Sequence, residues 1–384
     1  MRQKIYTFVL LIATALLLLI VLPNCSGGNG SATPADQTPS PTITSAAPIP
    51  IVTPPSIEPI GSLIYSNANL YQVTFQERAF NTLLHPSEEN PSNYFNTAGP
   101  CGGFIYFLLS NPVAQTSDIY RMKPDSGEME QLTFGNKQSL FRLSLDCQSM
   151  VYAFGVGGSE MSPNIVEYLD LETGISETLF TESVNSVYTY SLAWSPNNDL
   201  VAYTLIDDWD TGHISLFLLR PGGPAPQEVI LNGTLLSMQP GWSPDGAMLA
   251  IGLQTDQSVD IHLVNIETEA TERLLHVDGI PDEFIWSPDG KYLLYTVWLN
   301  TTSQYLDRLN LLSLETHQTT TIQNGDSPRG GYRAVWSPDG RDLAYFTGTR
   351  LGEYRLHVFR PENDGHFEMD LYDIPDSNAT WTNP

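Results

Sequence analysis

The 384-residue chain is poor in basic residues, and this shortage bounds the partners that it can bind. It has 17 lysines and arginines against 43 aspartates and glutamates, and its formal net charge at pH 7 is -26. A nucleic-acid-binding surface needs clustered basic side chains to neutralise phosphates. The composition therefore excludes nucleic acid as a partner and leaves cationic, metal-rich or uncharged partners.

Charged residues of both signs are scarce as well. They make up 16% of the chain, whereas hydrophobic residues make up 41% and aromatic residues 10%. This apolar fraction suffices for a sizeable core, while a surface with few lysines and glutamates indicates strands and polar turns instead of helices. We therefore expect an all-β protein, and the length alone allows one large domain or two smaller ones.

The first 24 residues have the pattern of an export signal. Arg2 and Lys4 precede an apolar run from Phe8 to Leu22 that only Thr14 interrupts. A basic start followed by a short apolar stretch is typical of a secretory signal peptide. We therefore predict that residues 1–24 are a signal peptide and that the rest of the chain lies outside the cytoplasm.

The segment around Cys25 resembles the lipobox of bacterial lipoproteins, in which this cysteine is acylated after cleavage. It reads Leu22-Pro23-Asn24-Cys25, and Asn24 stands where that pattern prefers glycine or alanine. We expect lipidation of Cys25, which would anchor the protein in a membrane. An uncleaved signal anchor is the alternative, because the segment from Ile5 to Leu22 is just long enough to span a bilayer.

Residues 25–59 are dominated by glycine, serine, threonine, alanine and proline. Such a composition buries too little apolar surface to offset the entropy of ordering the chain. We predict that this segment is a disordered linker between the lipid anchor and a folded domain at residues 60–384.

A five-residue pattern recurs in the second half of the chain and predicts the fold. The four copies are Trp194-Ser195-Pro196-Asn197-Asn198, Trp242-Ser243-Pro244-Asp245-Gly246, Trp286-Ser287-Pro288-Asp289-Gly290 and Trp336-Ser337-Pro338-Asp339-Gly340. Serine, proline and glycine stand at the positions that a type I turn prefers, so each copy closes a hairpin between two strands. The spacing of 44 to 50 residues is typical of propeller blades.

The segments between these turns complete the blades. The stretch after each turn, such as Lys291-Tyr292-Leu293-Leu294-Tyr295, is apolar on both faces, which a strand covered on both sides requires. Two further strands follow in each unit, for example Asp260-Ile261-His262-Leu263-Val264. Four strands in a unit that is covered on both sides indicate one blade of a β-propeller.

Weaker copies and two terminal fragments complete the ring of blades. Cys101 and Cys147 lead into apolar strands in the same way as Gly340 does, which gives six full units. The fragment Leu63 to Thr74 is typical of later strands and the fragment Ala379 to Thr382 of a first strand. We therefore predict seven four-stranded blades, the last one closed by the N- and C-terminal strands, with six or eight blades as alternatives.

These repeats resemble the WD-repeat-like propeller repeat of TolB and of the propeller domains of prolyl-oligopeptidase-type enzymes. The resemblance covers residues 61–384 and implies a β-propeller, and the TolB side of it implies a binding role. No Gly-x-Ser-x-Gly nucleophile motif follows the repeats, so the peptidase activity is not implied.

Two tryptophans fall outside the repeat. Five of the seven occupy its first position, where packing between blades explains them. Trp209 and Trp298 are instead expected in loops that join the middle strands of their blades. Because an exposed aromatic ring can stack on a sugar or a partner side chain, they are the candidate binding surface.

The remaining candidate residues predict one disulfide bond and no cofactor site. Cys101 and Cys147 occupy the same position in neighbouring units of an exported protein, so we predict a disulfide between them. The acidic loop Asp207 to Asp210 does not match a calcium-binding loop and is interpreted as solvated. The seven histidines lack the spacing of a zinc site.

We therefore expect a monomeric, membrane-tethered propeller without catalytic residues, metal or cofactor, which binds a protein or carbohydrate partner. The alternative is a carbohydrate-active enzyme, a glycoside hydrolase or lyase, with carboxylates at the mouth of the central channel. Asp282, Glu283 and Asp326 precede the first strands of their blades and are the candidates for that role.

Overall fold

A computed structural model describes the folded domain in fourteen segments. They are residues 56–67, 69–84, 93–111, 116–135, 137–155, 164–181, 188–208, 213–237, 239–255, 258–300, 305–325, 332–348, 354–371 and 379–382. Pro55–Pro384 form one compact unit, and its described residues are strands and turns without a helix. Cys25, Trp209 and Asp326 lie outside the described residues.

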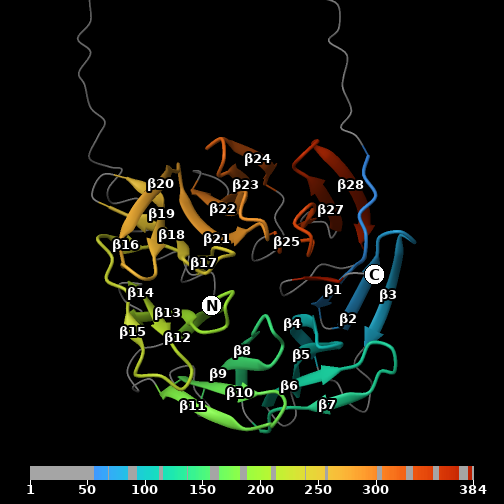
Figure 1. The fold of residues 1–384 in the computed structure, drawn as a ribbon. Helices are drawn as coiled ribbons and strands as arrows, with labels where there is room; N and C mark the ends of the chain where they lie inside the picture. The colour runs from blue at the N-terminus through green and yellow to red at the C-terminus, as the bar shows by residue number, and fades with distance from the viewer. Residues whose placement is uncertain are drawn as a thin grey trace, which may run out of the picture. The chain divides into compact units, whose positions relative to one another are not determined.

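The domain is a β-propeller of seven blades arranged around a common axis (Figure 1). The first three blades are listed here in strand order from the axis outward. Blade 1 comprises β29 (Thr380–Thr382), β1 (Ser62–Asn67), β2 (Asn69–Thr74) and β3 (Ala79–Leu84); blade 2 comprises β4 (Asn93–Cys101), β5 (Phe104–Asn111), β6 (Thr116–Met122) and β7 (Met129–Gln131); blade 3 comprises β8 (Lys137–Leu143), β9 (Ser149–Gly155), β10 (Asn164–Asp170) and β11 (Ser176–Thr181).

The other four blades follow the same antiparallel order, and the inner strand of blade 5 is split in two. Blade 4 comprises β12 (Tyr188–Trp194), β13 (Val201–Asp208), β14 (His213–Leu219) and β15 (Gln227–Glu228); blade 5 comprises β16 (Thr234–Leu235) and β17 (Gly241–Trp242), then β18 (Met248–Gln254), β19 (Val259–Asn265) and β20 (Thr271–His276); blade 6 comprises β21 (Ile280–Trp286), β22 (Tyr292–Asn300), β23 (Tyr305–Ser313) and β24 (Thr319–Asn324); blade 7 comprises β25 (Val335–Trp336), β26 (Leu343–Gly348), β27 (Tyr354–Arg360) and β28 (Gly365–Leu371).

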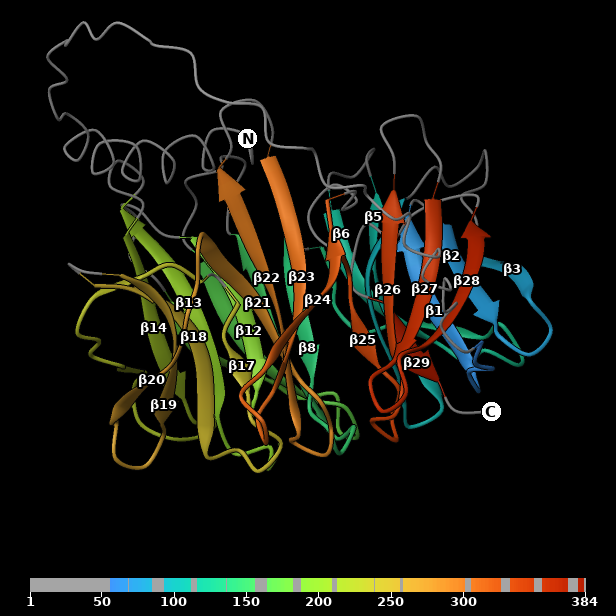
Figure 2. The same ribbon diagram turned by 90° about the horizontal axis from the view of Figure 1, so that it is seen from above.

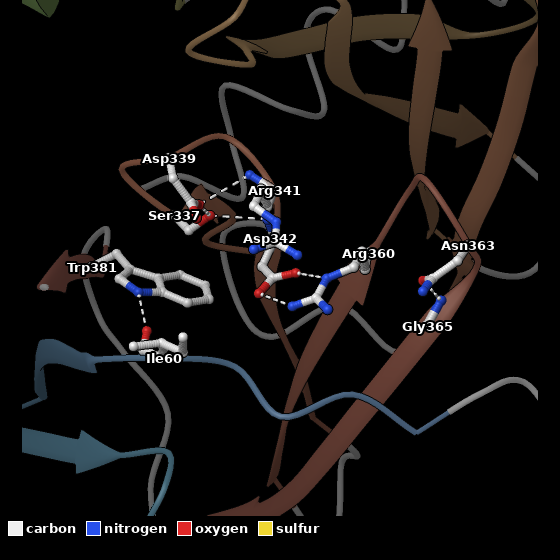
Figure 3. A network of polar contacts seen from close by, with 9 residues as sticks. All are labelled: Ile60, Ser337, Asp339, Arg341, Asp342, Arg360, Asn363, Gly365 and Trp381. Atoms are coloured by element: carbon white, nitrogen blue, oxygen red, sulfur yellow. Dashed lines mark hydrogen bonds and ion pairs between the residues drawn. The ribbon is translucent and has the colours of Figure 1, made fainter. Parts of the chain in front are cut away.

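The two ends of the domain close the ring of blades, as the sequence predicted. β29 pairs antiparallel with β1, and Leu63 lies opposite Trp381. The indole N–H of Trp381 donates to the carbonyl oxygen of Ile60 at 2.9 Å (Figure 3). The prediction of seven blades is therefore confirmed, and blade 1 is the shared blade.

The segment before β1 also packs against the domain. Ser56 forms a parallel bridge with His366 in β28, and the backbone N–H of Ile57 donates to the His366 carbonyl oxygen at 3.1 Å. The Ile57 side chain is buried against Gly365, where an added Cβ atom would lie 2.2 Å from it. Residues 56–59, which the composition placed in the linker, thus lie along the edge of blade 7.

The repeated turn is held by its own serine and aspartate. In blade 7, Ser337 donates to Asp339 at 2.6 Å and accepts from the backbone N–H of Asp342 at 2.9 Å (Figure 3). Gly340 adopts a φ of +72°, which glycine tolerates without steric cost. The hairpin predicted from each copy of the pattern is therefore formed, and Asp342 is further held by Arg360 at 2.6 Å.

The tryptophan of the turn pattern links three of the blades to the blade before them. The indole N–H of Trp194 donates to a carbonyl oxygen in β8, that of Trp242 to one in β12, and that of Trp286 to one in β17. All three distances lie between 3.0 and 3.1 Å. We call this contact the indole link.

The remaining boundaries between blades depart from this arrangement. The indole N–H of Trp336 in blade 7 is buried without a hydrogen-bond partner among the described residues. In blade 3, Leu143 pairs with Met150 in the same way as Trp336 of blade 7 pairs with Leu343. Blade 3 therefore has a leucine at the position of the tryptophan. A disulfide joins blades 2 and 3 instead.

The disulfide connects Cys101 to Cys147 with the Cα atoms 5.3 Å apart. The disulfide closes a loop of 46 residues and so reduces the entropy of the unfolded chain. Removing it restores that entropy and costs about 4 kcal/mol of stability in the loop-entropy model. We predict that reduction lowers the guanidinium midpoint of the wild-type protein. A variant with Cys101→Ser and Cys147→Ser should already have the lower midpoint and should not respond to reductant. Equal midpoints for all four samples would show that the thiols are not bonded in solution.

The indole link is testable by comparing two tryptophans in the same position of the repeat. Trp286→Phe removes a hydrogen bond, whereas Trp336→Phe removes an N–H that has no acceptor. Because only Trp286→Phe breaks a hydrogen bond, it should lower the free energy of unfolding by about 1 kcal/mol more than Trp336→Phe does. Denaturant unfolding of both variants measures this difference. Equal losses would mean that the indole N–H contributes nothing to the contact between blades.

Candidate functional site

The inner strands of blades 6 and 7 share one irregularity. In blade 6, Ile285 lies opposite Leu294 but Asp282 lies opposite Thr296, so two residues of β21 face one residue of β22. Within this bulge Glu283 adopts a φ of +55°. Such left-handed backbone is uncommon for residues other than glycine and is concentrated at functional sites.

Arg333 occupies the equivalent position in blade 7. It adopts a φ of +52°, and it precedes Trp336 by three residues as Glu283 precedes Trp286. The backbone N–H of Phe346 donates to the carbonyl oxygen of Tyr332 at 2.9 Å, which continues the sheet past the bulge. Neighbouring blades therefore carry an acidic and a basic residue at the same strained position.

Two more carboxylates belong to this group. Burial raises the pKa of Glu283 to about 7, the Arg333 guanidinium opposes this rise, and the charges of Asp282 and Asp307 add to it. Asp307 is 8% exposed and Arg333 is 9% exposed, whereas Asp282 and Glu283 are only partly buried. Arg333, Asp282 and Asp307 thus each act on the charge of Glu283.

A buried tyrosine holds the two blades together beside these charges. The hydroxyl of Tyr332 lies 2.7 Å from the carbonyl oxygen of Asp307 and 2.8 Å from that of Gly325. The backbone N–H of Gly325 also donates to the Asp307 carbonyl oxygen at 2.8 Å. These bonds fix the start of β23 and the segment before β25, and so the relative positions of Asp307 and Arg333.

Trp298 lies in strand β22 and not in a loop, so its predicted placement was wrong. It faces Ile280 in β21 and Asp307 in β23. Because side chains alternate along a strand, it shares a sheet face with Leu294, which packs against blade 7. Trp298 is partly exposed and is a diagonal neighbour of Asp282 on this face.

We call the group formed by Asp282, Glu283, Trp298, Asp307 and Arg333 the blade 6–7 site. It lies at the ends of the strands away from the Trp-Ser-Pro-Asp-Gly turns, because Asp282 and Trp298 lie near the far ends of β21 and β22. In Figure 1, β21 and β25 are neighbours near the centre of the ring. Figure 2 shows the strands of these blades standing side by side.

Some of these residues were found from the sequence and others were not. Asp282, Glu283 and Trp298 were candidates for two different functions, and the structure brings them together. Arg333 and Asp307 were missed. Arg333 was detectable, because aligning the repeats places it at the position of Glu283. Asp307 has no comparable signal, since only the folding of β23 beside β22 brings it to the site.

Other candidate features are placed as follows. Backbone atoms of Asp207 and Asp208 belong to β13, and Cys25, Trp209 and Asp326 lie outside the described residues. Within the described segments, no three histidine, cysteine, aspartate or glutamate side chains are grouped to hold a metal ion. No helix in those segments has the length and hydropathy needed to span a membrane.

The raised pKa of Glu283 gives a prediction about stability and pH. The pKa of Glu283 is about 4.5 in the unfolded chain and about 7 in the folded protein. The contribution of this carboxyl group to stability is therefore fully present below pH 4.5 and is lost as the pH rises through 7. Glu283→Gln cannot ionise, so its free energy of unfolding should exceed that of the wild type by about 1 to 3 kcal/mol at pH 8. The two proteins should be alike near pH 4.5.

Denaturant unfolding at the two pH values measures this difference. Glu272→Gln, which removes an exposed carboxylate from the outer strand of blade 5, is the matched control and should show no such gain. A Glu283→Gln variant that is less stable than the wild type at pH 8 would show that the ionised carboxylate is well satisfied in the fold.

Comparison with known proteins supports the fold. Residues 191–365 match the family model described as the TolB beta propeller domain. An uncharacterized protein of Agrobacterium fabrum is 26% identical over 185 residues, which span 48% of this chain and 58% of that relative.

The names of solved structures with this fold describe proteins of different kinds. TolB from Acinetobacter baumannii superposes with a TM-score of 0.53 at 13% identity, over 83% of this chain and 81% of that one. An oligogalacturonate lyase from Vibrio parahaemolyticus superposes with a TM-score of 0.62 at 12% identity, over 78% of this chain and 86% of that one. Such identities concern the fold alone. With the repeat, the closed ring and the matched family model together, the chain is a TolB-like β-propeller of seven blades.

Proposed function

We propose that the protein is an extracytoplasmic binding module that holds its ligand at the blade 6–7 site. The observation that carries the proposal is the pairing of Glu283 and Arg333 at one strained position of adjacent blades. Burying charged side chains is costly, so charges at this position call for an explanation beyond folding. Residues held in such conformations mark sites where geometry serves a function.

The aromatic residue of the site fits a binding role. Trp298 is partly exposed beside Asp282, and it is anchored on both sides by its neighbours in β21 and β23. A rigid tryptophan next to polar groups offers a large contact area at a small loss of conformational entropy. The sequence-based expectation of a binding surface at Trp298 is therefore kept, with the surface at the blade 6–7 site.

Export and anchoring belong to the same proposal. The signal-like segment and the lipobox-like sequence at Cys25 would place the propeller outside the cytoplasm and tie it to a membrane, and an uncleaved signal anchor is the alternative. The TolB-like fold supports an extracytoplasmic location. The mass of the mature N-terminal peptide distinguishes a lipidated cysteine from an intact signal segment.

Catalysis is the second candidate, because one observation favours it. A carboxyl group with a pKa of about 7 can serve as a general acid or base at neutral pH, and Glu283 has this property. An oligogalacturonate lyase shares the fold. In an enzyme of this kind, Glu283 would transfer the proton and Asp282 or Asp307 would stabilise charge on the substrate.

One experiment separates binding from catalysis. The full-length protein is immobilised and exposed to cell-envelope extract, and the retained molecules are compared with those retained by Trp298→Ala and by the control Glu272→Gln. We expect at least one retained molecule to be lost with Trp298→Ala alone and to be recovered chemically unchanged. Recovery of cleaved glycan fragments would indicate the enzyme, and identical retention by all three proteins would remove the blade 6–7 site from the function.

A further inference from the structure

A cavity of about 450 Å³ lies at the boundary between blades 4 and 5, which are neighbours in the ring (Figure 1). We call it the blade 4–5 groove. Its lining includes Asn197, Leu218, Arg220 and Gln227 from blade 4, and Asn265 and Ile266 from blade 5. It lies at the ends of the strands that carry the Trp-Ser-Pro-Asp-Gly turns, so it is separate from the blade 6–7 site. Its volume is in the range of ligand-binding cavities.

The outer side of the groove is a loop instead of a long strand. The outer strand of blade 4, β15, has two residues, whereas those of blades 1, 3, 5, 6 and 7 have six or seven. Pro224 and Pro226 precede β15, and without a backbone N–H they cannot donate to a longer ladder with β14. Pro224 and the next residue therefore line the groove as part of the loop.

This loop has a defined conformation. The backbone N–H of Gly223 donates to the carbonyl oxygen of Arg220 at 2.9 Å, which closes a turn, and Gly222 adopts a φ of +67°. The Arg220 guanidinium donates to the carboxylate of Asp199 at 3.0 Å. The wall formed by blade 4 is therefore held by its own hydrogen bonds, and its guanidinium already has a counter-charge.

Asn265 stands where an equivalent turn of another blade has an aspartate. In blade 3, a carboxylate oxygen of Asp170 accepts hydrogen bonds from two backbone N–H groups and from the hydroxyl of Thr173. In blade 5, the side-chain oxygen of Asn265 accepts the same three bonds, the last from the hydroxyl of Thr268. The turn therefore forms with a carboxylate or with an amide, and it does not use the amide nitrogen.

Asn197 is a second exchange of the same kind. It stands where the other copies of the repeat have Asp245, Asp289 and Asp339. In all four copies the side-chain oxygen accepts from the serine hydroxyl of the turn, at 2.6 to 2.7 Å. Two different turns thus have an amide in place of a carboxylate, and both amides line the same groove.

These exchanges give the groove hydrogen-bond donors that the turns do not need. Within the described segments, the amide nitrogens of Asn197 and Asn265 have no hydrogen-bond partner. Gln227 donates its amide nitrogen to Glu269 at 2.5 Å, and its oxygen is left as an acceptor. Each exchange also removes a negative charge from a chain with a net charge of -26. The groove therefore offers two donors and one acceptor.

The rest of the lining is aliphatic. Phe217 and Leu219 pack toward blade 3, so Leu218 between them faces blade 5 and forms a wall of the groove. Ile266 lines the groove from blade 5. An extended peptide has backbone carbonyl and N–H groups beside side chains that alternate in direction, which fits polar groups next to aliphatic ones. A sugar has no aliphatic side chain to place against these walls.

We propose that the blade 4–5 groove binds an uncharged, extended peptide segment of a partner protein. The amide N–H groups of Asn197 and Asn265 donate to backbone carbonyl oxygens of the segment, and the Gln227 oxygen accepts a backbone N–H. An apolar side chain of the segment packs against Leu218 and Ile266. This is a second binding site, and it does not depend on the function proposed for the blade 6–7 site.

Selection from a peptide library tests the proposal. The immobilised full-length protein is exposed to hexapeptides of random sequence made from alanine, glycine, serine, threonine, valine and leucine, with acetylated and amidated ends. We expect a subset to be retained, and calorimetry then measures the affinity of those peptides. Asn197→Asp and Asn265→Asp should each weaken binding about tenfold, because each removes a donor and places a carboxylate opposite a carbonyl oxygen of the peptide.

The variants have matched controls, because the two turns accept either residue. Asn197→Asp and Asn265→Asp should unfold at the same denaturant concentration as the wild type, so that weaker binding does not reflect a damaged fold. Asp339→Asn and Asp170→Asn make the reverse exchanges in the corresponding turns of blades 7 and 3, outside the groove. They should leave the affinity within a factor of two.

Three results would overturn the proposal. One is that the variant carrying both Asn197→Asp and Asn265→Asp retains the same peptides as the wild type with the same affinity. Another is that the wild-type protein retains no member of the library. The third is that chitotriose or maltotetraose binds with a dependence on both asparagines while no peptide does, which would make the groove a saccharide site.

Discussion

The antiparallel pairing of β29 with β1 is the contact on which the rest of the structure depends. Each blade packs only on its two neighbours, so an open series of blades would leave two apolar sheet faces uncovered. The pairing covers both faces, and the buried cluster around Trp381 contains residues from blades 1 and 7. The two ends of the domain therefore meet in blade 1 and close the ring.

Within this closed ring, the boundaries that depart from the repeat are informative. Most follow one pattern, with apolar packing and, in three places, an indole link. Blades 2 and 3 lack the indole and are joined by Cys101 and Cys147, which restores a connection by other chemistry. Blades 6 and 7 keep the indole of Trp336, which has no acceptor in the described segments, and they carry buried charges as well. The disulfide between blades 2 and 3 is explained by stability, whereas the buried charges between blades 6 and 7 are not.

The sequence predicted the regular part of this protein well because the repeat is local. Serine, aspartate and glycine determine a turn within five residues, and the apolar strand that follows has to be covered on both faces. The position of Trp298 was predicted wrongly, since β22 continues for nine residues and no turn residue marks its end before Asn300. Arg333 and Asp307 join the site through a bulge and a strand pairing, which depend on contacts that no short segment encodes. The regions outside the described residues leave Cys25, Trp209 and Asp326 as predictions.

The placement of the charges bears on the choice between binding and catalysis. An acid catalyst needs a proton at neutral pH, and the raised pKa of Glu283 allows it to carry one. A cationic ligand would lower that pKa and remove the proton, so the same carboxyl group cannot both hold a cation and act as a general acid. An uncharged substrate would leave the proton in place. The sign of the ligand therefore decides the function of the site.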